Sequence, residues 1–118
     1  MPHGRRAGPE LHGRRAARAW RAAAQEIATL LALLGDHYGR RPILYVTSEF
    51  DWTYLRGRFD GETFWTRSLV LPPWFRTDRW LIWQYHNCGR RAGVNGPVDL
   101  NAFRGSKRDF EAFAAGVA

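Results

Sequence analysis

The stretch Pro42-Ile-Leu-Tyr-Val-Thr47 decides the fold class, because a continuous apolar and β-branched run is typical of a parallel strand covered on both faces. An amphipathic helix is expected directly before it, over residues 14–38, since apolar residues recur there every three or four positions. Gly39 stands where a left-handed C-terminal cap falls, and Pro42 blocks continuation of the helix. A helix followed by a buried strand predicts an α/β fold.

Two further short helices are indicated by their capping residues. Ser48 and Asp51 resemble a capping box directly after the first strand, and Gly57 would end that helix. Ser106 and Asp109 repeat the pattern before the aromatic residues of the C-terminal segment. Each helix is therefore expected to pack by a small apolar edge.

Three more strands are expected, over residues 64–68, 80–85 and 98–101. The segments between them contain Pro72-Pro73 and a glycine-rich stretch, which are loop signals rather than helix signals. The architecture thus changes from helix–strand alternation to strands without helices between them.

Length and composition favour one folded domain after a short tail. The 118 residues are 45% hydrophobic and 14% aromatic, which supplies a core, while residues 1–13 carry little to bury and are expected to form a disordered tail. The net charge of +7 implies attraction to a polyanion: nucleic acid, an anionic membrane face or an anionic cell-wall polymer. Residues 1–41 hold 8 Arg against 3 acidic residues, so the aromatic-rich remainder is only weakly basic.

Several classes of protein are disfavoured by what the sequence lacks. Cys88 is the single cysteine and the four histidines have no zinc-like spacing, so no disulfide, metal or cofactor is expected. The longest apolar run, residues 27–34, is too short for a bilayer, and the Arg-rich start is not followed by the apolar core of a signal peptide. Neither a membrane span nor an export signal is expected in this chain.

Two motifs carry polar groups inside apolar strands. In Trp80-Leu-Ile-Trp-Gln-Tyr85 the rings could stack on sugar faces while Gln84 orients the sugar, or the rings could be core residues of a two-sided strand. In Gly96-Pro-Val-Asp-Leu-Asn101, Asp99 could serve glycoside chemistry, or it could bond its own backbone in a turn or pair with an arginine. Spacing alone leaves both pairs of interpretations open.

Five motifs follow one another along residues 38–113: Arg41-Pro-Ile-Leu-Tyr-Val-Thr47, Phe64-Trp-Thr-Arg67, Trp80-Leu-Ile-Trp-Gln-Tyr85, Gly93-Val-Asn-Gly-Pro-Val-Asp-Leu-Asn101 and Phe103-Arg-Gly-Ser106. In this order and spacing they resemble the last four strands of the family 25 glycoside hydrolases, which are lysozymes of the N-acetylmuramidase type. The resemblance implies a TIM-like barrel of five β/α units followed by three strands. Residues 14–118 would form an incomplete, C-terminal part of that barrel.

The resemblance also implies a site at the C-terminal ends of the strands. Asp99 matches the aspartate of the family's last strand and is the catalytic residue expected here. The substrate-binding residues that it implies are Tyr45, Trp65, Trp83, Gln84 and Tyr85. No metal is implied. We expect the side chains of Tyr45, Trp65, Gln84 and Asp99 to converge.

The activity implied is hydrolysis of the bond between N-acetylmuramic acid and N-acetylglucosamine in peptidoglycan, by a secreted or cell-wall-associated protein. The family's first aspartate and its Asp-x-Glu pair have no counterpart, because the acids upstream of residue 38 are Glu10, Glu26 and Asp36, none of them in an apolar strand. The chain therefore resembles a truncated or mis-started fragment. It is expected to be inactive alone, because hydrolysis needs one group to protonate the leaving oxygen and a second to activate water or stabilise the cation. Open strand edges would favour self-association.

Two alternatives belong to other functional classes. A non-catalytic module could bind cell-wall glycan through the same aromatic residues. A nucleic-acid binder would account for the charge, but the arginine-rich segment and the aromatic strands lie apart in the sequence, so no nucleic-acid partner is expected.

Overall fold

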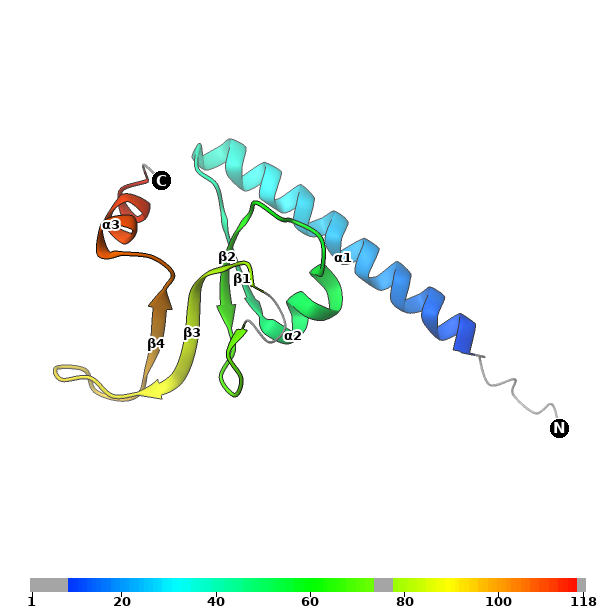
Figure 1. Ribbon diagram of the computed structural model, residues 1–118. Coiled ribbons are helices and arrows are strands. Elements are labelled where there is room, and N and C mark those ends of the chain that lie inside the picture. Colours follow the sequence, from blue (N-terminus) through cyan, green and yellow to red (C-terminus); the bar gives the residue numbers. More distant parts are fainter. Residues whose placement is uncertain (1–8, 74–77, 117–118) are drawn as a thin grey trace.

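The computed structural model describes residues 9–73 and 78–116 and confirms the α/β class (Figure 1). Its elements in chain order are α1 (Pro9–Tyr38), β1 (Ile43–Thr47), α2 (Ser48–Phe50), the π-helix η1 (Asp51–Leu55), β2 (Thr63–Arg67), β3 (Trp80–Gly89), β4 (Val98–Phe103) and α3 (Lys107–Ala115). Helix α1 begins at Pro9 rather than at Arg14, and residues 1–8 of the expected tail lie outside the described residues. Among the described residues, even the 30-residue helix α1 lacks a sufficiently apolar stretch to be a candidate membrane span.

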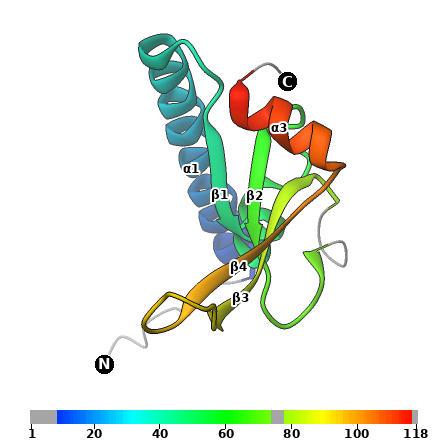
Figure 2. The same ribbon diagram turned by 90° about the vertical axis from the view of Figure 1, so that its left-hand side faces the viewer.

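The four strands form one sheet in the order β1-β2-β3-β4. Strands β1, β2 and β3 run parallel, while β4 returns antiparallel to β3. The C-terminal ends of the three parallel strands therefore lie at one edge of the sheet, where β4 begins. The hairpin between β3 and β4 projects beyond this edge, and α3 lies at the opposite edge (Figures 1 and 2).

The core lies on one face of the sheet. Val46, Leu55 and Phe64 are its buried residues, and Ile27 of α1 packs against them. Alternation along β1 directs Val46 toward this core and Tyr45 to the other face. The expectation that this strand is covered on both faces is wrong, because Tyr45 is 51% exposed and β2 is the single strand that pairs with β1 among the described residues.

The helix after β1 is capped differently from the sequence expectation. The N-cap is Thr47, whose Oγ1 accepts a hydrogen bond from the Phe50 backbone N–H at 3.1 Å, so a capping box at Ser48 and Asp51 is wrong. Asp51 is instead fully buried and binds the guanidinium of Arg79. The ion pair with Arg79, rather than helix capping, accounts for the acid at this buried position.

Helix α3 has the capping box that the sequence predicts. The Asp109 backbone N–H donates to Ser106 Oγ at 3.1 Å, and the Ser106 backbone N–H donates to Asp109 Oδ2 at 2.8 Å. Phe103 of β4 contacts the rings of Phe110 and Phe113, with centroids 5.3 and 5.6 Å away. The aromatic edge of α3 therefore anchors this helix to the end of the sheet.

The capping box predicts a pH dependence for α3. The Ser106 backbone N–H, and next its hydroxyl, lower the pKa of Asp109 below its ordinary value of 3.8. A lowered pKa in the folded chain means that the interaction stabilises α3 above that ordinary value and is lost as pH falls through the lowered pKa. We expect the NMR shifts of residues 107–115 to lose helical character in that acid range. Ser106→Ala should move the Asp109 midpoint upward, whereas Glu111→Gln should not; an Asp109 midpoint at or above 3.8 in the unsubstituted chain would contradict this.

Candidate functional site

Four side chains from the four strands contact one another on the sheet face opposite the core, and we call them the strand-face cluster: Tyr45, Trp65, Gln84 and Asn101. The Tyr45 hydroxyl donates to Gln84 Oε1, and the Tyr45 and Trp65 rings meet edge to face with centroids 4.9 Å apart. The Trp65 indole N–H donates to Asn101 Oδ1 at 2.8 Å. The strand-face cluster thus links all four strands.

Strand register explains why these residues meet. Tyr45 pairs with Trp65 across β1 and β2, and Gln84 pairs with Asn101 across β3 and β4. Residues paired in this way share a face of the sheet, so sequence positions up to 56 residues apart become neighbours. The strand-face cluster lies near the middle of β1 and β2 rather than at the strand ends.

The strand-face cluster combines one exposed ring, that of Tyr45, and one partly buried ring, that of Trp65, with amides that have spare donors. Tyr45 is half exposed, while Gln84 is only 3% exposed and its Nε2 donates to no described residue. An oriented amide beside two aromatic rings can contact a ligand that has both an apolar face and a rim of hydroxyls, such as a sugar.

Asp99 extends this face along β4. It lies two residues before Asn101, so strand alternation places both on the same side, and both are exposed. Neither a hydrogen bond nor an ion pair joins Asp99 to another described residue, so the turn and arginine-partner interpretations have no support here. Its carboxylate faces solvent on the side of the strand-face cluster, toward the C-terminal ends of the parallel strands.

Trp83 and Tyr85 are not brought together with the strand-face cluster. They alternate with Gln84 along β3, and their rings contact each other with centroids 5.7 Å apart. The Trp83 indole N–H donates to the Ser68 carbonyl at 2.8 Å, which ties β3 to the end of β2. Asn101 joins the strand-face cluster instead; the same alternation, counted from Asp99, could have identified it.

No second carboxylate is paired with Asp99 in the part of the chain that the structure describes. Glu49, which follows β1, is exposed in the first turn of α2 and contacts none of the residues of the strand-face cluster in any described interaction. Within residues 9–73 and 78–116, no group of three or more His, Cys, Asp or Glu side chains could hold a metal ion.

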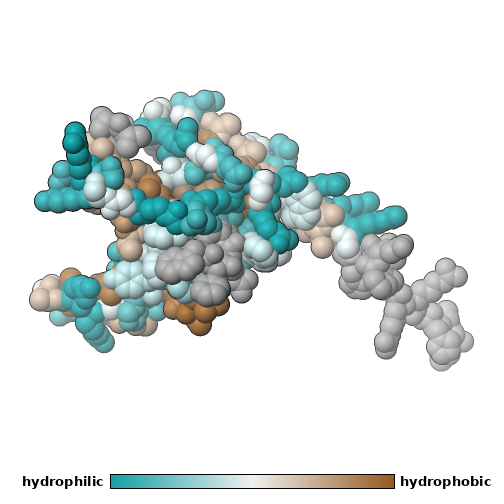
Figure 3. Space-filling view, viewed as in Figure 1, coloured by the Kyte–Doolittle hydropathy of each residue, from teal (hydrophilic) through white to brown (hydrophobic). Residues whose placement is uncertain are grey.

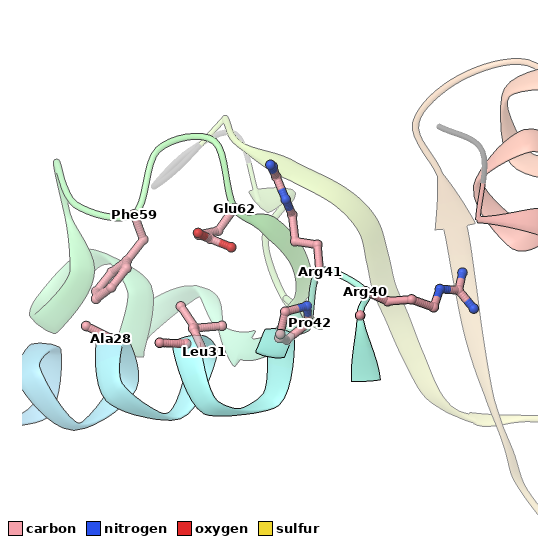
Figure 4. A pocket seen from close by; sticks show the side chains of 10 residues that line it. Ala28, Leu31, Arg40, Arg41, Pro42, Phe59 and Glu62 are labelled. Carbon is pink, nitrogen blue, oxygen red and sulfur yellow. The ribbon is translucent and has the colours of Figure 1, made fainter. Parts of the chain in front are cut away.

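Two cavities lie at the other end of the strands. One, of about 590 Å³, is lined by the apolar side chains of Ala28, Leu31 and Phe59 and by the charged side chains of Arg41 and Glu62 (Figure 4). The other, of about 720 Å³, lies between the start of β1 and α3. Neither is lined by a residue of the strand-face cluster, so the strand-face cluster remains the candidate site.

Comparisons with known proteins give relatives for part of this chain. It is 30% identical to the uncharacterized protein YegX of Escherichia coli K12, over 79% of this chain and 35% of that protein. It is 33% identical to Lysozyme M1 of Streptomyces globisporus, over 67% of this chain and 29% of that protein. The chain thus spans about a third of the length of the curated relatives that it matches. No family model matches.

A solved structure shares both sequence and fold with this chain. It is a family 25 glycosyl hydrolase from Bacillus anthracis, 32% identical, with a TM-score of 0.67. The match covers 78% of this chain and 44% of the solved chain. The shared fold therefore covers most of this chain and less than half of the solved one.

Proposed function

We propose that this chain, which is similar to the C-terminal part of a family 25 glycoside hydrolase of the lysozyme type, binds the glycan strand of peptidoglycan on its strand-face cluster. The likeness to that family is confirmed by the lysozyme relative and by the solved structure. The contacts of Tyr45 and Trp65 with Gln84 and Asn101 carry the proposal, because they hold two rings and two amides together on the sheet face opposite the core. Secretion or cell-wall association would follow from that substrate.

The sheet is proposed to be one part of a TIM-like barrel. Two observations support this: the outer edge of β1 is unpaired among the described residues, and Leu30 and Leu33 of α1 are more than half exposed. In folded proteins strand edges are normally paired or protected, and large apolar patches are normally covered. Where they are not, they favour self-association.

The reaction proposed for the complete site is hydrolysis of the bond between N-acetylmuramic acid and N-acetylglucosamine. Glycosidases divide the work between two carboxyl groups, about 5–5.5 Å apart in retaining enzymes and about 6.5–9.5 Å apart in inverting ones. Asp99 is the single carboxylate beside the strand-face cluster among the described residues. We therefore propose that the 118-residue chain binds glycan without cleaving it. This proposal coincides with the alternative of a non-catalytic module that binds cell-wall glycan.

The test is clearing of a bacterial cell-wall suspension by the purified chain. Because a general acid or base contributes about 100-fold to 10,000-fold to the rate, we expect no clearing above that of an Asp99→Asn variant. Both proteins should nevertheless sediment with insoluble peptidoglycan. Clearing that Asp99→Asn abolishes would show that a second carboxylate operates, and Glu49→Gln would be examined next.

A further inference from the structure

Arg67 is the last residue of β2 and lies beside the strand-face cluster. It stands two residues after Trp65, so alternation along the strand places both on the same face. Its register partners are Thr47 on β1 and Gln84 on β3. Arg67 is thereby placed beside Gln84 in the neighbouring strand, at the C-terminal edge of the sheet.

This arginine differs from other arginines packed against the sheet. Arg79 binds the buried carboxylate of Asp51, and Arg104 pairs with Asp78 at 2.8 Å. Arg67 is partly buried but forms neither a hydrogen bond nor an ion pair with any described residue. A partly buried guanidinium without a partner among the described residues has donors available for a ligand, and burial reduces the screening of its charge.

Asp99 does not form an ion pair with Arg67. It lies on β4, so the strand β3 separates it from Arg67, and neighbouring strands are about 4.8 Å apart. Arg67 pairs with Gln84, whereas Asp99 lies two residues before Asn101, the other partner of Gln84, so the two charged residues lie on one face of the sheet on either side of β3. A ligand lying diagonally across β3 would meet the cation on one side and the carboxylate on the other.

We propose that Arg67 binds a carboxylate carried by the glycan, and so selects acidic glycan strands over neutral ones. The inference rests on the proposed function, because it assumes that the glycan lies on the strand-face cluster. A guanidinium can bind a carboxylate through two parallel N–H···O bonds, which a neutral sugar cannot match. The carboxylate can belong to the acidic sugar itself or to a peptide attached to it.

The experiment compares the affinities of three probes by calorimetry. They are a neutral N-acetylglucosamine tetramer, a peptide-free tetramer alternating N-acetylglucosamine with N-acetylmuramic acid, and the same tetramer bearing its peptides. The unsubstituted chain should prefer an acidic probe over the neutral one by about 10-fold to 100-fold, the usual range for a hydrogen-bonded charge. The acidic probe that is preferred identifies the source of the carboxylate.

Arg67→Gln should abolish that preference and leave affinity for the neutral tetramer unchanged. Arg108→Gln, an equal charge change on α3 at the opposite edge of the sheet, should keep the preference. If Arg67→Gln does not fold, Arg67→Lys replaces it and should reduce the preference in part, because an ammonium cannot bind in bidentate fashion.

Three results would overturn the proposal. Equal affinity of the unsubstituted chain for neutral and acidic probes, or an equal loss in Arg67→Gln and Arg108→Gln, would refute the role of Arg67 while leaving glycan binding intact. Failure of all three probes to bind would refute the proposed function together with this inference.

Discussion

Replacing Arg79 by methionine is expected to lower the free energy of unfolding by about 3–5 kcal/mol, because it leaves a buried carboxylate without its partner. Asp51 is fully buried, and the guanidinium that binds it is only 18% exposed. The same group donates to the Leu55 carbonyl at 2.9 Å and lies 4.2 Å from the centre of the Phe64 ring. Arg79 thus joins η1 to the segment before β3 across the core.

Arg104→Met is the matched control, and urea unfolding followed by tryptophan fluorescence measures both variants. Arg104 also pairs with an aspartate and stacks on a ring, that of Trp80 at 4.1 Å, but it is 41% exposed. An exposed pair of this kind contributes about 0–1 kcal/mol. Adding Asp51→Asn to Arg79→Met should recover part of the loss. A loss in Arg79→Met no larger than in Arg104→Met would contradict this account of the core.

Trp65→Ala is expected to weaken binding of the alternating tetramer by about 30-fold or more. A buried aromatic anchor typically contributes about 2 kcal/mol or more to binding, and 1.4 kcal/mol corresponds to a factor of ten. Trp65 supplies the ring between Tyr45 and Asn101, so its loss also frees the Asn101 amide. Calorimetry measures the affinity, and circular dichroism checks that the variant folds.

Trp52→Ala is the control for this substitution. Trp52 is a partly exposed tryptophan of η1, stacked under Arg56 at 4.1 Å, and it belongs to the helical layer rather than to the strand-face cluster. Its replacement should leave affinity for the tetramer unchanged. A similar loss in both variants would mean that the glycan is not bound on the strand-face cluster.

The strands could be predicted from the sequence because each is a local apolar run bounded by turn residues. The segments expected at residues 64–68, 80–85 and 98–101 correspond to β2, β3 and β4. The longer extent of β3 is not evident from the local sequence, because His86 and Gly89 are held in the strand by pairing with β4, a long-range effect. Gly89 fits there because a Cβ atom would lie 2.6 Å from Leu100 Cγ.

Contacts between distant residues could not be predicted in the same way. The Asp51–Arg79 pair joins positions 28 residues apart, and the local pattern suggested a helix cap for Asp51 instead. The placement of Trp83 and Tyr85 away from Gln84 was predictable, since neighbouring residues of a strand point to opposite faces. Alternation thus divides the aromatic motif of residues 80–85 between the two faces of the sheet.

The loop after β2 carries apolar side chains that face solvent. Leu69, Val70 and Leu71 are exposed, and hydrophobic surface appears over this loop at the lower edge of the molecule (Figure 3). The loop follows Ser68, which accepts the Trp83 indole N–H through its carbonyl. Its start is therefore fixed by β3, while its apolar side chains face outward.

Glycan binding by the strand-face cluster is tested most directly by an NMR titration of the chain with the alternating tetramer. We expect the largest shift changes at the Trp65 indole N–H, at the side-chain amides of Gln84 and Asn101, and at the backbone of Asp99. Changes confined to α1 or to the cavities beside Arg40 and Arg41 would contradict it, as would a spectrum that saturating tetramer leaves unchanged.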